Sequence, residues 1–149
     1  MPDHHEIKVL PWSAAQMYDL VADVPNYPKF LPWNSAARIR SRMATPEGEV
    51  LDAELVISFK VFRERFGSRV VLFPARHRIE TEYLDGPFRH MQSTWAFRDL
   101  PSGGCEVDFR VDFEFRNAIL GAVIGVVFSE AMQRIVRAFE RRAAELYGA

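Results

Sequence analysis

An alternation of apolar and polar residues runs through the middle of the chain, from about residue 35 to residue 115. It is clearest over residues 105–115, where every second residue is apolar and those between are Glu, Asp or Arg. Residues 51–59 alternate likewise, and the odd-numbered residues of 91–97 form another row that we expect to face inward. A period of two is typical of a strand with one dry and one wet face. We therefore predict a sheet with a single apolar face.

Four groups of turn-forming residues interrupt this alternation. They are Thr45–Gly48, Phe73–Pro74, Asp85–Pro87 and Pro101–Gly104. Pro and Gly at these places favour tight connections between strands that follow one another in the chain. About six antiparallel strands are therefore predicted in this part of the sequence.

Helical and irregular segments precede the strands. A short strand, Glu6–Leu10, leads into a helix that runs to about Ala22, and Ser13 with Gln16 forms a capping box at its start. The next segment, residues 23–33, has three prolines, which prevent a long helix, and several large apolar side chains that demand burial. We expect an ordered apolar loop there, with one short helical turn.

A long amphipathic helix is predicted over Asn117–Tyr147. Its apolar residues recur at three- and four-residue spacing, and its length of ~45 Å would be enough to cross the sheet. Glu130 and Arg134, and likewise Arg141 and Glu145, are spaced to pair on its solvent side. These elements predict an α+β fold in which a curved antiparallel sheet of about seven strands wraps a long C-terminal helix.

Two interpretations of the space between sheet and helix remain open. The helix turn expected to face the large rings of the sheet contains Gly121, Ala122 and Gly125, which supply little volume. A twisted sheet curls, so a helix on its concave side can stand off from it and leave a cavity. Alternatively, the small residues let the helix pack tightly on the sheet.

Composition limits the class of protein. The 149 residues, 48% of them hydrophobic and 13% aromatic, predict one domain, residues 1–149, with a sizeable core. A net charge of −1 gives no overall attraction to nucleic acid or to an anionic membrane. The apolar run at residues 118–128 is shorter than the ~20 residues of a membrane span. One cysteine and no signal-peptide pattern at the N-terminus favour the cytoplasm.

Few residues are candidates for catalysis or for metal binding. The acids of residues 106–114 are expected on the wet face of their strand, and Cys105 is expected to be a small core residue rather than a nucleophile. The histidines at residues 4–5 point to opposite faces and are expected in solvent, and His77 and His90 are expected on the surface. No catalytic residue, metal ligand or cofactor is assigned, and we predict that the protein is not an enzyme.

Arginines are concentrated in the first strands of the predicted sheet. Arg38, Arg40 and Arg42 stand on one side of a strand, and more arginines follow between residues 63 and 78. Left unpaired, they would form a basic stripe for ribosomal RNA or lipid phosphates. We favour the alternative, in which carboxylates on neighbouring strands neutralise them, because the whole chain is slightly acidic.

Five segments carry a resemblance to a known family. They are Asp23–Trp33, Phe62–Val70, Asp85–Arg89, Trp95–Phe97 and Val111–Phe115. In this order they resemble the coenzyme Q-binding START family, also described in bacteria as the ribosome-association toxin (RatA) family, and the match spans nearly the whole chain. The succession of predicted elements is similar to the helix-grip fold of START, Bet v 1-like and polyketide cyclase domains.

The resemblance implies a binding protein with an apolar tunnel. We expect it to hold ubiquinone (coenzyme Q) or a related lipid and to support respiratory electron transport as a quinone carrier or chaperone, with transient contact at the inner face of the membrane. The alternative is a RatA-like toxin that binds the ribosome and blocks the association of its subunits. A cyclase-like enzyme of the same fold is less favoured, since no inward acid–base pair is identifiable.

The ligand is expected between the sheet, the Phe30–Trp33 loop and the first half of the terminal helix. Together with Trp12 and Tyr27, that loop is interpreted as a lid and membrane-docking edge rather than as a cap on the core. The residues predicted to contact the ligand are Phe30, Leu31, Trp33, Leu55, Ile57, Phe59, Trp95, Phe97, Val107, Phe109, Val111, Phe113, Ile124 and Phe128.

Overall fold

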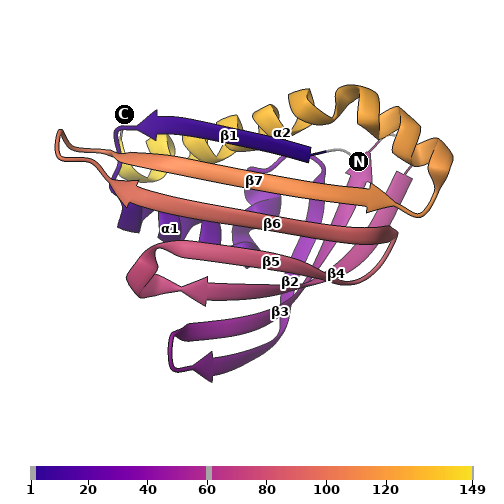
Figure 1. The fold of residues 1–149 in the computed structure, drawn as a ribbon, viewed down its shortest axis with the longest axis horizontal. Helices are drawn as coiled ribbons and strands as arrows, with labels where there is room; N and C mark the ends of the chain where they lie inside the picture. Colours follow the sequence, from indigo (N-terminus) through magenta and orange to yellow (C-terminus); the bar gives the residue numbers. More distant parts are fainter. Residues whose placement is uncertain (1–2, 60–61, 149) are drawn as a thin grey trace.

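A seven-stranded antiparallel sheet carries both helices on one side in the computed structural model, which describes residues 3–59 and 62–148 (Figure 1). The strands are ordered β1-β7-β6-β5-β4-β3-β2, so the first strand pairs with the last. The predicted α+β class, the six strands in the middle of the chain and the long terminal helix are confirmed. The elements are β1 (Asp3–Leu10), α1 (Ala14–Ala22), η1 (Val24–Lys29), β2 (Asn34–Thr45), β3 (Gly48–Phe59), β4 (Phe62–Phe73), η2 (Pro74–Arg76), β5 (Arg78–Asp85), β6 (Phe88–Asp99), β7 (Cys105–Phe115) and α2 (Ala118–Tyr147).

The sheet is strongly curved. In Figure 1, β1, β7 and β6 run across the molecule, whereas β2, β3 and β4 cross them at a steep angle. The ladder register shifts between β4 and β5 at Gly67/Ser68, and twice between β2 and β3. Such irregularities bend a strand and increase its twist. The bend gives the sheet the concave side on which the helices lie.

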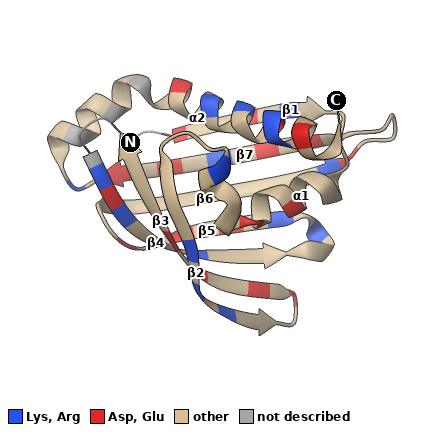
Figure 2. Ribbon diagram, turned by 180° about the vertical axis from the view of Figure 1, so that it is seen from behind, with Lys and Arg blue, Asp and Glu red and all other residues tan. Residues whose placement is uncertain are grey.

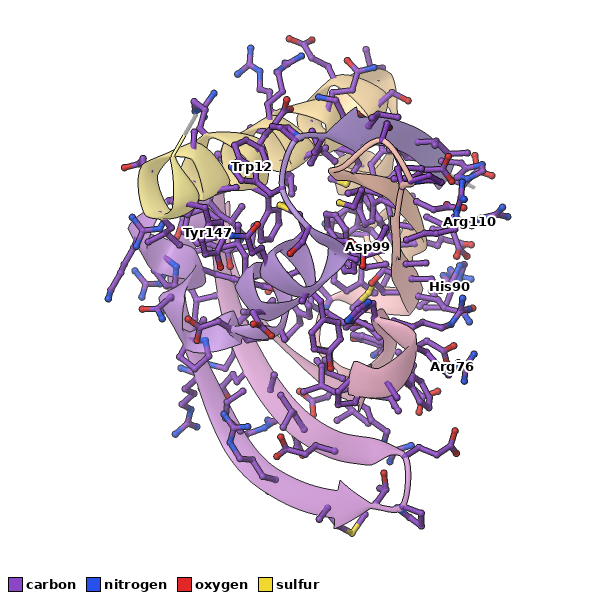
Figure 3. The ribbon with its side chains drawn as sticks, turned by 90° about the vertical axis from the view of Figure 1, so that its left-hand side faces the viewer. Trp12, Arg76, His90, Asp99, Arg110 and Tyr147 are labelled. Carbon is purple, nitrogen blue, oxygen red and sulfur yellow. The ribbon has the colours of Figure 1, made fainter. Side chains whose placement is uncertain are left out.

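The start of α1 is fixed by a capping box and by a hydrogen bond to the sheet. Ser13 Oγ accepts a hydrogen bond from Gln16 N at 3.1 Å, and Gln16 Oε1 accepts one from Ser13 N at 3.0 Å, which confirms the predicted capping box. In addition, Asp99 Oδ1 at the end of β6 accepts a hydrogen bond from Ala14 N at 2.8 Å (Figure 3). Helix α1 is therefore fixed to the sheet at its first turn.

The aromatic segment between α1 and β2 caps the core. The rings of Tyr27 and Phe30 pack edge-on against Phe139 of α2, with centroids 5.5 and 5.3 Å away, and Leu31 is buried. Trp12 is also buried, and its Nε1 donates to Gly148 O at 2.7 Å (Figure 3). In this structure these four residues cap the core, the alternative to the predicted lid, because each is buried or packed against α2.

Helix α2 is buried more extensively in its second half than at its beginning. In its second half, Val136, Ala138, Phe139 and Ala143 are buried. At its beginning, by contrast, Ile119 is 78% exposed and Val126 is 87% exposed. Helix α2 therefore leaves the core part-way along its length. No helix in the part of the chain that the structure describes is long and apolar enough to cross a membrane.

Cross-strand ion pairs neutralise arginines of the sheet. Arg40 contacts Asp52 at 2.7 Å, and Arg69 contacts Glu82 at 2.7 Å. The guanidinium of Arg38 lowers the pKa of Glu54, to which it donates a hydrogen bond. The favoured interpretation of the arginine cluster is thus confirmed for these strands. On α2, Glu130 pairs with Arg134 as predicted, but the predicted Arg141–Glu145 pair is wrong, since Glu145 contacts Arg142.

Removing the ring of Phe139 should destabilise the protein severely. We expect Phe139→Ala to lower the free energy of unfolding by ~3–5 kcal/mol, because the ring touches the sheet and the capping segment at once. Its matched control on the same helix is Ile119→Ala, for which we expect less than ~0.5 kcal/mol. Urea unfolding followed by circular dichroism measures both, and similar losses in the two variants would contradict the uneven seating of α2.

Candidate functional site

A cavity of about 360 Å³ lies between the curved sheet and the middle of α2. This volume is within the range of small-molecule sites in proteins. Its wall is almost entirely apolar, with contributions from the residues before and at the start of β2, from β3, β4, β6 and β7, and from α2. The lining residues are Pro32, Trp33, Asn34, Ile57, Phe66, Phe88, Met91, Val111, Phe113, Phe115, Phe128, Glu130, Ala131, Met132, Arg134 and Ile135.

Four buried phenylalanines, one each from β4, β6, β7 and α2, form the framework of this cavity. Phe88 packs edge-on against Phe66 at 5.4 Å and against Phe113 at 5.3 Å, and Phe113 packs against Phe128 at 4.6 Å. Edge-to-face arrangements of this kind are favourable beyond the area they bury. The four rings form a hydrophobic cluster separate from the main core. They support the wall of the cavity, and α2 is attached to the cluster through Phe128.

The small residues of α2 do not pack closely on the sheet. Added to Gly121, a methyl group would come no closer than 3.8 Å to Phe115, and at Gly125 it would meet no described atom within 4 Å. Of the two interpretations left open by the sequence, close packing through these glycines is therefore wrong. The cavity is present because α2 stands away from the sheet beside the phenylalanine cluster.

Polar groups are few at the cavity. Glu130 and Arg134 stand on α2 at its rim, where they are exposed and pair with each other at 3.1 Å. Asn34 lies in the wall, and its Oδ1 is buried without a hydrogen-bond partner among the groups that the structure describes. A buried acceptor of this kind is uncommon, because leaving it unpaired is costly.

Trp33 reaches the cavity through an unusual backbone conformation. Its φ of 65° is in the left-handed region, which a bulky side chain seldom adopts. Trp33 O accepts a hydrogen bond from Ser58 N of β3 at 2.8 Å, which anchors the residue to the sheet. Strain of this kind is concentrated at functional sites, so it agrees with a role for Trp33 at the cavity.

The structure separates the residues predicted to contact a ligand into two groups. Those in the cavity wall are Trp33, Ile57, Val111, Phe113 and Phe128. The others described do not line the cavity and instead fill the core or pack against it, namely Phe30, Leu31, Leu55, Trp95, Phe97, Val107 and Phe109. The side chains of Phe59 and Ile124 lie outside the described residues.

Sequence reasoning missed several wall residues. Phe66 belongs to a strand in which no inward row had been assigned. Phe88 lies in the same strand as the predicted row of 91–97 but was not included in it, and the ladder register shifts between Phe88 and His90. Met91 and Phe115 lie in rows that were predicted to face inward, and a stricter use of the alternation would have included them. Asn34 gave no signal, since a single polar residue at a strand start is ordinary.

Histidine side chains on the sheet are hydrogen-bonded to acidic side chains. His90 contacts Asp112 at 2.9 Å, and Figure 3 shows it projecting with Arg76 and Arg110 from the side of the sheet away from the helices. The predicted surface position of His90 is confirmed, whereas the predicted solvation of His4 is wrong, because its side chain is only 9% exposed beside Phe109. Within residues 3–59 and 62–148, no three His, Cys, Asp or Glu side chains are grouped to hold a metal.

The one cysteine, Cys105, is buried in the core, as predicted. Burial, assisted by the negative charge of Asp99, raises the pKa of its thiol from 9.0 to about 11. A thiolate is the nucleophilic form of cysteine, so this site disfavours nucleophilic chemistry.

Comparison with known proteins identifies the family. Residues 10–140 match the family described as polyketide cyclase / dehydrase and lipid transport. The chain belongs to this family. It is 38% identical to the ribosome association toxin RatA of Rickettsia prowazekii, over 93% of this chain and 94% of that protein. It is 37% identical to the coenzyme Q-binding protein COQ10 homolog B of Xenopus laevis, over 98% of this chain but only 59% of that protein.

A solved structure has the same helix-grip arrangement. The 18 kDa protein CC1736 from Caulobacter crescentus is 33% identical, with a TM-score of 0.83 over the whole of both chains. The names of the relatives describe a toxin and a coenzyme Q-binding protein, and the family description includes enzymes as well as lipid transport. Family membership thus supports binding of a hydrophobic ligand without selecting one of these activities.

The raised pKa of Cys105 predicts a loss of stability in alkaline solution. The folded state keeps the thiol proton to higher pH than the unfolded state, so the stabilisation present below pH 9 is lost as pH rises towards 11. We expect the free energy of unfolding to fall by at most about 1.4 kcal/mol per pH unit from this group. Buried Tyr27, whose pKa is also raised, adds to the loss.

Cys105→Ala should therefore show a shallower decline than the unsubstituted protein. Urea unfolding at pH 8, 9, 10 and 11 measures the two slopes, and the constant loss of stability caused by the smaller side chain does not affect them. Identical slopes would contradict a buried, protonated thiol.

Proposed function

We propose that the protein binds an apolar small molecule with a planar head group, of the coenzyme Q type, in the cavity between the sheet and α2. The observation that carries this proposal is the phenylalanine-lined cavity of about 360 Å³, held open by a cluster separate from the main core. The similarity to a coenzyme Q-binding protein over nearly the whole chain supports the choice of ligand. Quinone carriage in cellular respiration is the corresponding role.

Burial of apolar surface would drive the binding. Each Å² removed from water contributes ~25 cal/mol, reduced by the cost of ordering the ligand. Flat rings of a ligand can stack against the edges and faces of Trp33 and Phe88 in the cavity wall. The cavity holds a head group and a short stretch of chain, so a long isoprenoid tail would continue past the rim.

The apolar beginning of α2 offers a path for that tail and a contact with a membrane. Ile119, Val123 and Val126 follow one another on the exposed side of the helix. An apolar stripe of this kind suits transient contact with a lipid surface. We therefore propose a cytoplasmic protein that touches the inner face of the membrane when it loads or releases its ligand.

The polar groups at the cavity favour binding over catalysis. Glu130 and Arg134 are paired and exposed, and Asn34 does not titrate. General acid–base catalysis requires a titratable group beside the reacting atoms, in a setting that tunes its pKa. We accordingly propose that the protein is not an enzyme.

A ribosome-binding function is the second candidate. It is favoured by the similarity to RatA over more than nine-tenths of both chains, and by Arg137 and Arg141, which are exposed on one side of α2. No ion-pair partner of either arginine occurs among the described residues, and Figure 2 shows basic residues interspersed with acidic ones along α2. Unpaired arginines can contact RNA phosphates. This surface replaces the sheet arginines proposed from the sequence, which are neutralised.

Filling the cavity should abolish ligand binding. We expect Ala131→Trp to weaken the binding of a short-tailed ubiquinone more than tenfold, because the indole would occupy the space between α2 and the phenylalanine cluster. Ala122→Trp is the matched control, since Ala122 is exposed on the same helix and does not line the cavity. Titration followed by tryptophan fluorescence measures the affinity.

Ligand-dependent thermal stabilisation provides a second measurement of the same prediction, since a ligand that binds the folded state raises the Tm. Wild type and Ala122→Trp should respond alike, and Ala131→Trp should not respond. Absence of any quinone or lipid in organic extracts of the purified protein, together with no response of the wild type to added quinone, would exclude the proposal.

Charge reversal on α2 tests the second candidate. We expect Arg137→Glu with Arg141→Glu to abolish co-sedimentation with ribosomal subunits and the steep salt dependence of that binding. Arg38→Glu is the control on the sheet, where the arginine is paired with Glu54. Co-sedimentation that does not depend on salt, or the absence of co-sedimentation, would contradict a ribosomal function. Neither result would affect the cavity proposal.

A further inference from the structure

The outward side of α2 changes from apolar to basic along its length. Ile119, Val123 and Val126 are exposed in its first turns, which contain no charged residue (Figure 2). Arg137 and Arg141 are exposed in its second half. Because Arg137 follows Ile119 by about five helical turns, or ~27 Å, the two residues stand on the same side of the helix. Together these five residues form the outward line of α2.

Ion pairs cancel the other charges on the second half of α2. Each of its three glutamates has a basic partner, and the pairs are Glu130–Arg134, Glu140–Lys8 and Glu145–Arg142. Neither Arg137 nor Arg141 has an ion-pair partner among the residues that the structure describes. The charge that α2 presents to solvent is therefore positive, and it comes from these two arginines.

The rim of the cavity lies between the apolar and the basic part of this line. Glu130 and Arg134 border the cavity and are exposed on α2, after Val126 and before Arg137. An apolar chain that leaves the cavity past this rim emerges beside the outward line. Exposing such a chain to water is unfavourable, whereas an apolar layer against α2 would receive it. The outward line is thus continuous with the opening of the proposed ligand site.

We propose that the outward line of α2 docks on an anionic phospholipid surface. The apolar residues would enter the layer below the head groups, and Arg137 and Arg141 would contact the phosphates. This inference rests on the proposed function and specifies which lipid its membrane contact selects. Apolar side chains bind a bilayer interface of any charge, whereas arginines near the surface add attraction only where the lipids are anionic.

The combination of apolar and basic residues on one line favours lipid over RNA as the partner. RNA phosphates would contact the two arginines, but they would leave Ile119, Val123 and Val126 in water. An anionic bilayer offers a partner to both parts of the line, since it has a charged surface above an apolar layer.

Sedimentation of the unmodified protein with lipid vesicles provides the test. One set of vesicles contains phosphatidylcholine alone, and the other contains equal parts of phosphatidylcholine and phosphatidylglycerol. We expect the protein to partition about thirtyfold more strongly to the anionic vesicles, because each of the two arginines contributes about fivefold. The preference should diminish as the salt concentration rises.

Removal of the arginines should abolish this preference. In Arg137→Ala with Arg141→Ala, binding to the anionic vesicles should fall to the level found with phosphatidylcholine alone. The matched control is Arg76→Ala with Arg110→Ala, which removes the same charge from the side of the sheet away from the helices (Figure 3). This control should keep the preference of the wild type.

Replacement of the apolar residues should weaken binding to both kinds of vesicle. We expect Ile119→Ser with Val126→Ser to reduce partitioning about tenfold or more, because both side chains are exposed and lose apolar area that the lipid would cover. The preference for anionic lipid should remain in this variant, since Arg137 and Arg141 are unchanged.

The outcomes distinguish this inference from the proposed function. Equal binding of the wild type to both vesicles, or a preference that survives removal of both arginines, would overturn the inference. Loss of ribosome co-sedimentation in the arginine variant, with vesicle binding unchanged, would assign the arginines to RNA and overturn it as well. Titration of short-tailed ubiquinone without vesicles tests the proposed function separately, and failure of the wild type to bind it would overturn that function.

Discussion

Phe139 of α2 packs against Trp95 of β6 and against Tyr27 and Phe30 of the capping segment, with ring centroids between 5.2 and 5.5 Å apart. This contact joins the sheet, the helix and the connection between α1 and β2 at a single point. Because the seat is near the C-terminal end of a 30-residue helix, the beginning of α2 is left without the same support. The uneven attachment of α2 is the constraint from which the cavity follows.

The phenylalanine cluster turns that uneven attachment into a defined site. Where α2 departs from the core, Phe128 meets rings from three strands, and the space between them stays apolar. Close packing would ordinarily remove such a space, since interiors are packed as densely as organic crystals. Asn34 and the strained backbone of Trp33 lie at the same wall, and neither contributes to a tighter core. An unfilled apolar space, a buried acceptor without a described partner and a strained backbone at one place agree with a binding site.

The cavity and the two arginines of α2 belong to different parts of the molecule. The cavity is bounded by the sheet and the middle of α2, whereas Arg137 and Arg141 are exposed further along the helix. A ligand and an RNA surface could therefore be recognised independently by one chain. This separation gives a physical reason why similar sequences can carry names that refer to a quinone and to the ribosome.

Most of the architecture could be predicted from local patterns. Alternation over 105–115, turn residues between strands and the Ser13 capping box each depend on a few neighbouring residues, and all three were confirmed. Alternation also predicted which residues face inward, but an inward side chain can either fill a core or border a space. Trp95 and Phe109 fill the core, whereas Val111 and Phe113 on the same inner face border the cavity. That difference was decided only by where α2 rests on the curved sheet, because the distance between two packed layers depends on contacts between residues far apart in the chain.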